Sequence, residues 1–138
     1  MKVIVNFLFL TVATILLTIN GYTKDDVDLL AEVIYWENWY TDAEKETAYW
    51  TGAVVMNRVY SDEWPNSIHD VLYQKGQYST TKYFFTKEIP EECYGMARQI
   101  LAFGTNDVPK DVVFQATFKQ GKIWKQKNGE FFCYGSTK

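Results

Sequence analysis

The segment from residue 43 to residue 60 constrains the fold of this 138-residue chain more than any other. Its middle, Trp50–Met56, is apolar and contains Gly52 and Ala53, two small residues that let another backbone approach closely. The pattern predicts a helix at about Ala43–Tyr60 that is buried at the centre of the molecule. The length suits one compact domain with its own core and is too short for two ordinary domains.

The rest of the chain predicts further helices and a small sheet. Helices are predicted at about Val27–Asn38, Ser67–Tyr73 and Pro90–Phe103, and strands at Val112–Gln115, Lys122–Trp124 and Phe131–Tyr134. Asn128-Gly129 is a strong hairpin turn, and residues 74–81 are predicted as a loop that can pass into a short strand. The predicted fold class is therefore α+β, a helical domain with a small C-terminal antiparallel β-sheet over residues 25–138.

The first 21 residues predict export. Met1-Lys2 is a short basic start, Val3–Ile19 is uncharged and mostly aliphatic, and Asn20-Gly21 ends the apolar run. This is the pattern of a secretory signal peptide or a short membrane anchor. We expect an extracellular or cell-envelope protein, with cleavage of the leader and its retention at the membrane both open.

Composition and charge exclude some classes of function. The net charge of −3 argues against a general nucleic-acid binder, and the 47% hydrophobic content argues against disorder. Aromatic residues make up 17% of the chain, which suits core packing and stacking on sugar rings alike. The lysines near the C-terminus, Lys119, Lys122, Lys125 and Lys127, form either a solvated hairpin face or a contact for an anionic polymer such as a bacterial wall.

Two cysteines and one histidine limit the available chemistry. In an oxidising compartment, Cys93 and Cys133 are predicted to form a disulfide. The alternative is a cysteine nucleophile with His69 as its base, although the residues around His69 predict a surface helix. No metal-ligand pattern or phosphate loop is present, so we expect no cofactor.

The predicted first helix carries two glutamates, and helical phase separates them. At about 100° per residue from Val27, Glu37 falls at roughly 280°, in the middle of the apolar arc. Glu32 falls at roughly 140°, near Asp28 on the polar side, and is predicted to be a solvated surface residue. Glu37 is predicted to point toward the core at the C-terminal end of the helix.

Burial and the helix C-terminus should both raise the pKa of Glu37. A carboxylic acid that stays protonated near neutral pH is what a glycosidase uses to protonate a leaving oxygen. The alternatives are a glutamate that leaves the core as the helix frays, or one that pairs with Arg58.

Three strings carry a family resemblance: LLAEVIYWEN, TGAVVMNRV and WPNSIHDVLYQKGQYS, followed by DVVFQATFKQG. In order and spacing they resemble the catalytic domain of spore cortex-lytic enzymes and related cell-wall hydrolases (the SleB/CwlJ type), over essentially all of Val27–Tyr134. The resemblance implies cleavage of peptidoglycan glycan strands in a lysozyme-like or lytic-transglycosylase-like fold. It also implies that Glu37, which ends the first helix, is the general acid/base.

The resemblance implies further contacts and a mechanism. Gln77, Tyr78 and Ser79 are expected to bind the sugars, with Asn57, Gln115 and Lys119 as further candidates; for Asn57 and its neighbour Arg58, a capping or ion-pair role is equally open. A lone acid fits a lytic transglycosylase, in which Glu37 protonates the glycosidic oxygen and then deprotonates the C6 hydroxyl of the muramic acid. Two-carboxylate hydrolysis would need a second acid. The acids considered for that role, Asp62, Glu63 and Asp70, are outside the family's motif.

The sequence departs from the family at two places. A His near the C-terminus, in a Gly-x-His-x-aromatic ending, is missing from Gly129–Tyr134, and the connection Trp39–Glu46 lacks the usual glycines. These departures put the role of that His and the shape of the cleft in doubt. They motivate a rival hypothesis, a wall-binding module without catalysis.

Three functions follow as hypotheses. The first is a peptidoglycan lyase or hydrolase, expected to act as a monomer, which could equally be a membrane-tethered lysin of phage type. The second is the wall-binding module, and the third is a cysteine peptidase of the wall peptides.

Overall fold

The computed structural model describes residues 18–135, and the predicted signal or anchor lies almost entirely outside them. At its end, Ile19 and Tyr22 exchange backbone hydrogen bonds across Asn20-Gly21, so the apolar run ends in a tight turn, as predicted. Among residues 18–135, no helix is both long and apolar enough to cross a bilayer.

The helices and strands follow each other in the order predicted, which confirms the α+β class. Their bounds are α2 (Lys24–Asn38), α3 (Glu46–Tyr60), α4 (Ile68–Leu72), the 3₁₀ helix η1 (Ser79–Tyr83), α5 (Glu91–Phe103), β1 (Val112–Ala116), β2 (Ile123–Lys127) and β3 (Glu130–Tyr134). The strands of the described region form an antiparallel sheet in the order β1-β3-β2. The predicted strand near residues 74–81 is wrong, because η1 occupies that part of the chain.

Helix ends are set by local chemistry that the sequence contains. Thr23 and Asp26 form a capping box at the start of α2, and Ser67 accepts a hydrogen bond from the backbone N–H of Asp70 to cap α4. Gly104 ends α5 with a φ of 75°. Asn128 and Gly129 have φ angles of 51° and 79°, the left-handed pair that a tight hairpin turn requires.

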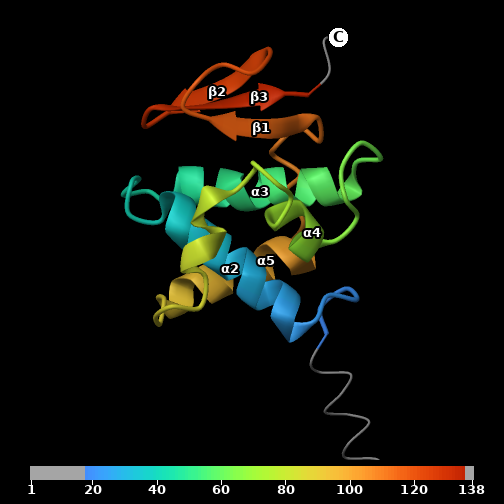
Figure 1. Ribbon diagram of the computed structural model, residues 1–138, viewed down its shortest axis with the longest axis vertical. Helices are drawn as coiled ribbons and strands as arrows, with labels where there is room; N and C mark the ends of the chain where they lie inside the picture. The colour runs from blue at the N-terminus through green and yellow to red at the C-terminus, as the bar shows by residue number, and fades with distance from the viewer. Residues whose placement is uncertain (1–17, 136–138) are drawn as a thin grey trace, which may run out of the picture.

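Helix α3 lies at the centre of the molecule, as predicted (Figure 1). The sheet covers one side of it, while α2 and α5 lie on the other. The core accordingly has two parts, a large one among the helices and a smaller one, around Trp50, Val54 and Phe132, between α3 and the sheet. Because α3 has a covered surface on both sides, it needs an apolar surface on both sides.

Gly52 is the point of closest approach between α3 and its helical neighbours. A methyl group at this position would lie 2.5 Å from Cδ1 of Ile100 on α5 and 3.3 Å from Cδ1 of Ile34 on α2. The small residue therefore sets how closely the three helices pack.

The predicted disulfide between Cys93 and Cys133 is wrong, because both are free and buried. Cys93 belongs to α5 and packs in the core among the helices, whereas Cys133 belongs to β3. Helix α3 lies between α5 and the sheet (Figure 1). An oxidising compartment favours a disulfide only where the fold brings two sulfurs together.

Candidate active site

Glu37 lies in the last turn of α2 and is half-buried. The hydroxyl of Thr80, which η1 brings against the end of α2, donates a hydrogen bond of 2.7 Å to its Oε1. Burial raises the pKa of Glu37, the Thr80 hydrogen bond opposes this, and the negative charge of Glu130 adds to the rise. The predicted placement of Glu37 toward the core and the predicted direction of its pKa are confirmed.

The prediction that Glu32 is a solvated surface residue is wrong, because only 1% of the residue is exposed. The indole N–H of Trp36 donates a hydrogen bond of 2.9 Å to its carboxylate, and the backbone N–H of Phe85 donates another. Its charge raises the pKa of Cys93 and of Tyr94, so it faces α5. The helical wheel assigned that side of α2 to solvent because it treated α2 as covered on one face only.

A chain of hydrogen bonds links the end of α2 to the sheet. The hydroxyl oxygen of Thr51, on α3, accepts one from Asn38 at 2.8 Å and another from the amide of Gln115, on β1, at 3.0 Å. The same Gln115 amide lies 3.2 Å from Oε1 of Glu130, the first residue of β3. Thr51 therefore holds the neighbour of Glu37 and the strand residue Gln115 in a fixed relation.

Arg58 holds the loop that carries Tyr78. Its Nε donates to the carbonyl of Val113 at 2.7 Å, and one terminal nitrogen donates to Gln77 at 3.2 Å. The guanidinium lies 4.1 Å from the ring centre of Trp64 and 5.3 Å from that of Tyr78. Within the described residues Arg58 makes no ion pair with Glu37, so that alternative reading of Glu37 has no support.

Two polar side-chain atoms are buried without a hydrogen-bond partner in the described region: the hydroxyl of Tyr78 and the side-chain oxygen of Gln115. Tyr78 is 9% exposed. Burial raises its pKa, Arg58 lowers it, and the charges of Glu37 and Glu130 raise it, so the phenol lies within the field of both acids. Since buried polar groups are rarely left unpaired, these two atoms are candidates for hydrogen bonds to a water or a ligand.

The comparison with protein-family models matches residues 42–133 to the family described as cell wall hydrolases. The match spans more than half of the chain. The chain belongs to the cell wall hydrolase family. No curated protein and no solved structure gives a significant match. The matched region begins after Glu37, so the family assignment does not depend on that residue.

In this member of the family, the residues predicted to bind substrate divide into two groups. Tyr78 lies within the influence of the Glu37 charge, whereas Gln77 bonds to Arg58 and Gln115 bonds to Thr51 and Glu130. Ser79 is exposed at the start of η1. Asn57 donates to the carbonyls of Pro109 and Val112, both at 3.0 Å, which fixes the approach to β1, the structural alternative considered for it. Lys119 is exposed in the connection between β1 and β2.

Sequence reasoning missed Thr80 and Glu130, which lie far from Glu37 along the chain. The acids considered for the second carboxylate, Asp62, Glu63 and Asp70, are all exposed, and Asp70 pairs with His69. The sequence contained one usable signal, because a hairpin at Asn128-Gly129 places Glu130 at the beginning of a strand that can pair with the strand of Gln115.

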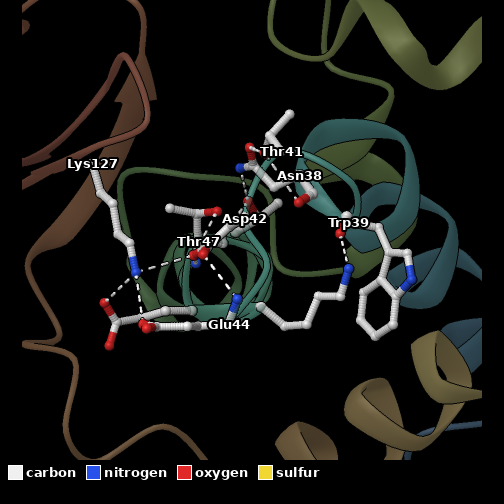
Figure 2. Close-up of polar contacts among 10 residues, drawn as sticks. Asn38, Trp39, Thr41, Asp42, Glu44, Thr47 and Lys127 are labelled. Carbon is white, nitrogen blue, oxygen red and sulfur yellow. Dashed lines mark hydrogen bonds and ion pairs between the residues drawn. The ribbon is translucent and has the colours of Figure 1, made fainter.

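The connection between α2 and α3, which lacks the family's glycines, is tied to the sheet (Figure 2). Asp42 is 4% exposed and accepts hydrogen bonds from the backbone N–H groups of Glu44 and Thr47, which start α3 later than predicted. Lys127, on β2, lies 3.2–3.3 Å from carboxylate oxygens of Asp42, Glu44 and Glu46. These contacts lower the pKa of Asp42, the backbone hydrogen bond of Thr47 most of all. Lys127 is therefore neither a solvated lysine nor free to bind a polymer.

The cysteine hypothesis gains no support from the structure. Burial raises the pKa of Cys93 to about 12, opposite to the shift that activates a thiol. His69 is exposed, bonds to Asp70 at 3.0 Å and stacks on Tyr73. Among residues 18–135, no group of three His, Cys, Asp or Glu side chains is arranged to hold a metal ion.

A surface groove of roughly 930 Å³ lies beside this site and not over Glu37. It is lined by Tyr60, Trp64, Val113 and residues of the connection from α5 to β1, among others. Trp64 also stacks on Arg58, whose other ring contact is Tyr78. The groove and the surroundings of Glu37 are thus joined through Arg58.

Proposed function

We propose that this chain cleaves the glycan strands of peptidoglycan, with Glu37 as general acid and then general base. The observation that carries the proposal is a half-buried carboxyl group with a raised pKa and a hydroxyl donor, whose charge acts on the buried phenol of Tyr78. A buried carboxyl group of this kind is protonated to a larger extent near neutral pH than an exposed one. Membership of the cell wall hydrolase family supports peptidoglycan as the substrate.

In the first step, the Glu37 carboxyl group gives its proton to the glycosidic oxygen as the bond from that oxygen to the anomeric carbon breaks. In the second step, the carboxylate takes a proton from the group that attacks the anomeric carbon. If that group is the C6 hydroxyl of the same sugar, a 1,6-anhydro end forms, and if it is water, a reducing end forms.

The loop of residues 77–79 and the adjacent sheet residue would hold the sugar. Tyr78 can donate from its unpartnered hydroxyl, and Gln115 can accept through its unpartnered oxygen. Gln77 and Ser79 are exposed at the rim, where they can reach the hydroxyl and acetamido groups of a glycan. A polymer needs more than one subsite, and the groove lined by Trp64 offers an aromatic ring for the next sugars.

A wall-degrading enzyme must reach the wall, and residues 1–21 would provide the export signal or anchor. We propose action in the cell envelope or outside the cell. The protein would act as a monomer and need no cofactor.

The test is digestion of purified peptidoglycan sacculi by the wild-type protein and by Glu37→Gln. We expect soluble muropeptides from the wild type and a loss of about 10³-fold in rate for the variant, within the usual range for an acid/base residue. Glu88→Gln, at an exposed acid on the loop after η1, is the matched control and should keep full activity. Equal rates for Glu37→Gln and wild type would show that Glu37 is not the acid.

A wall-binding module without catalysis is the second candidate, and the missing C-terminal His favours it. It predicts that the protein sediments with insoluble wall and releases no muropeptides. The same digestion therefore separates the two candidates.

A further inference from the structure

Glu130 lies opposite a lysine that forms its ion pairs with other acids. In the hairpin of β2 and β3 it stands directly opposite Lys127, the arrangement in which a cross-strand ion pair normally forms. Lys127 instead points its ammonium group to Asp42, Glu44 and Glu46 on the connection before α3 (Figure 2). Among the described residues, no cation pairs with Glu130.

The partner that Glu130 does have is neutral. The amide nitrogen of Gln115 lies 3.2 Å from one carboxylate oxygen and 3.4 Å from the other, and the same nitrogen bonds to Thr51. An amide donor orients a carboxylate without cancelling its charge. The half-buried side chain is therefore both positioned and uncompensated.

The position of Glu130 relates it to the candidate acid. Thr51 accepts a hydrogen bond from the side chain of Asn38, the residue after Glu37, and is linked through Gln115 to Glu130. One network therefore joins the neighbour of the first acid to the side chain of the second. The charge of Glu130 acts on Glu37 and on the phenol of Tyr78. The hydroxyl of Tyr78, which is buried and has no partner among the described residues, lies within the influence of both acids.

Two carboxyl groups with different surroundings divide the work of a glycosidase. The one that is kept protonated serves as acid, and the one that stays ionised serves as base or nucleophile. Glu37 has the surroundings of the first, and Glu130, which the Gln115 amide orients within the same hydrogen-bond network, has the position of the second.

We propose that Glu130 is the second catalytic carboxylate of this chain, the base that activates the water which attacks the anomeric carbon. The inference rests on the proposed function for Glu37 as the acid, and in the branch where water attacks it gives the base step to Glu130 in place of Glu37. Glu37 gives its proton to the leaving oxygen as the glycosidic bond breaks, while the Glu130 carboxylate takes one proton from water and the water oxygen bonds to the anomeric carbon. One water is consumed per bond, and both products end in hydroxyl groups, one of them a reducing end.

The test compares the wild type with Glu37→Gln, Glu130→Gln and Glu130→Ala on purified sacculi, with mass spectrometry of the released muropeptides. The wild type should release reducing ends, which are heavier than anhydro ends by one water. Glu130→Gln retains an oxygen that accepts from Gln115, so it should fold with a melting temperature no lower than that of the wild type and lose about 10²–10⁴-fold in rate.

Azide provides a readout that a merely structural role would not change. In Glu130→Ala the missing carboxylate leaves room for an azide ion, which needs no base to attack the anomeric carbon. We expect added sodium azide to restore cleavage in Glu130→Ala and to give glycosyl azide products, with no such rescue in Glu37→Gln.

The outcomes distinguish the inference from the proposed function. If Glu37→Gln is inactive while Glu130→Gln cleaves at the wild-type rate, or if the wild type releases only anhydro ends, the role of Glu130 is refuted and that of Glu37 stands. If Glu37→Gln is as active as the wild type, both are refuted.

Discussion

Glu32 and Glu37 lie five residues apart on the same helix, and burial raises the pKa of both. Their partners differ. Glu32 is enclosed against α5, where the Trp36 indole and the Phe85 backbone supply it with internal donors. Glu37 is half-exposed, has the Thr80 hydroxyl as its donor, and acts by its charge on the phenol of Tyr78, whose hydroxyl has no partner among residues 18–135. A buried carboxyl group becomes a candidate for catalysis when its surroundings leave room for a ligand, and burial alone does not distinguish the two.

The largest expected difference between Glu32 and Glu37 is the effect of their substitution on activity. We expect Glu37→Gln to lower the rate of sacculus digestion by about 10³-fold, because the amide cannot donate a proton to the leaving oxygen. Glu32→Gln should change the rate per folded molecule by no more than a few-fold. A similar loss in both variants would mean that Glu37 acts through the fold, and the comparison would fail.

The effects on stability should have the reverse order, with a larger loss on substitution of Glu32 than of Glu37. Glu32→Ala leaves the buried donors of Trp36 and Phe85 without an acceptor, which should lower the free energy of unfolding by about 2–4 kcal/mol. Glu37→Ala leaves a single hydroxyl, that of Thr80, which can turn to water, so its effect should stay below about 1 kcal/mol. Urea unfolding followed by tryptophan fluorescence measures both, and a larger loss for Glu37→Ala would contradict the assignment.

Both acids should contribute to the dependence of stability on pH. A raised pKa means that the fold favours the protonated form, so this contribution to stability is complete below the ordinary value of 4.5 and is lost as pH rises through the folded value. Melting temperatures measured from pH 4 upward should fall less steeply in Glu32→Gln and in Glu37→Gln than in the wild type. Glu130→Gln should reduce only the part that Glu37 contributes, since the charge of Glu130 acts on Glu37.

The smallest expected effect concerns Thr80, whose hydroxyl donates a hydrogen bond to Glu37. Thr80→Val removes a hydrogen bond to the carboxylate, so the pKa of Glu37 should rise further and the basic limb of the pH–rate profile should move to higher pH. Thr86→Val, at an exposed threonine whose hydroxyl bonds to the carbonyl of Tyr83, is the control and should leave the profile unchanged. A shift to lower pH would show that the protonated form of Glu37 is not the active one.

The sequence predicted well what depends on neighbours along the chain. The Asn128-Gly129 turn and the burial of α3 follow from local residue types, and helical phase placed Glu37 correctly. The same wheel misplaced Glu32, because whether α5 covers the polar side of α2 is decided by packing between distant segments. Thr80 and Glu130 lie 43 and 93 positions from Glu37, and only the folded chain brings them into its surroundings.

The errors have a common physical cause. The predicted disulfide followed from the compartment and the count of cysteines, which say nothing of the distance between two sulfurs. The four lysines near the C-terminus were treated as one cluster. Lys127 differs from that prediction, because its place on β2 brings it to the acids on the connection before α3. In each case the missing information was which segments meet.

Substitution of Gly52 offers a way to control the enzyme in living cells. It touches α2 and α5 on one side, and its neighbour Thr51 anchors the hydrogen bonds that reach Gln115 and Asn38. An alanine there would press on Ile100 and strain the packing by about 1–3 kcal/mol, without changing any group that meets the substrate. A loss of that size weakens a fold most as heating brings it close to melting. Gly52→Ala is thus a candidate for a temperature-sensitive allele, with which wall lysis could be switched off by warming a culture.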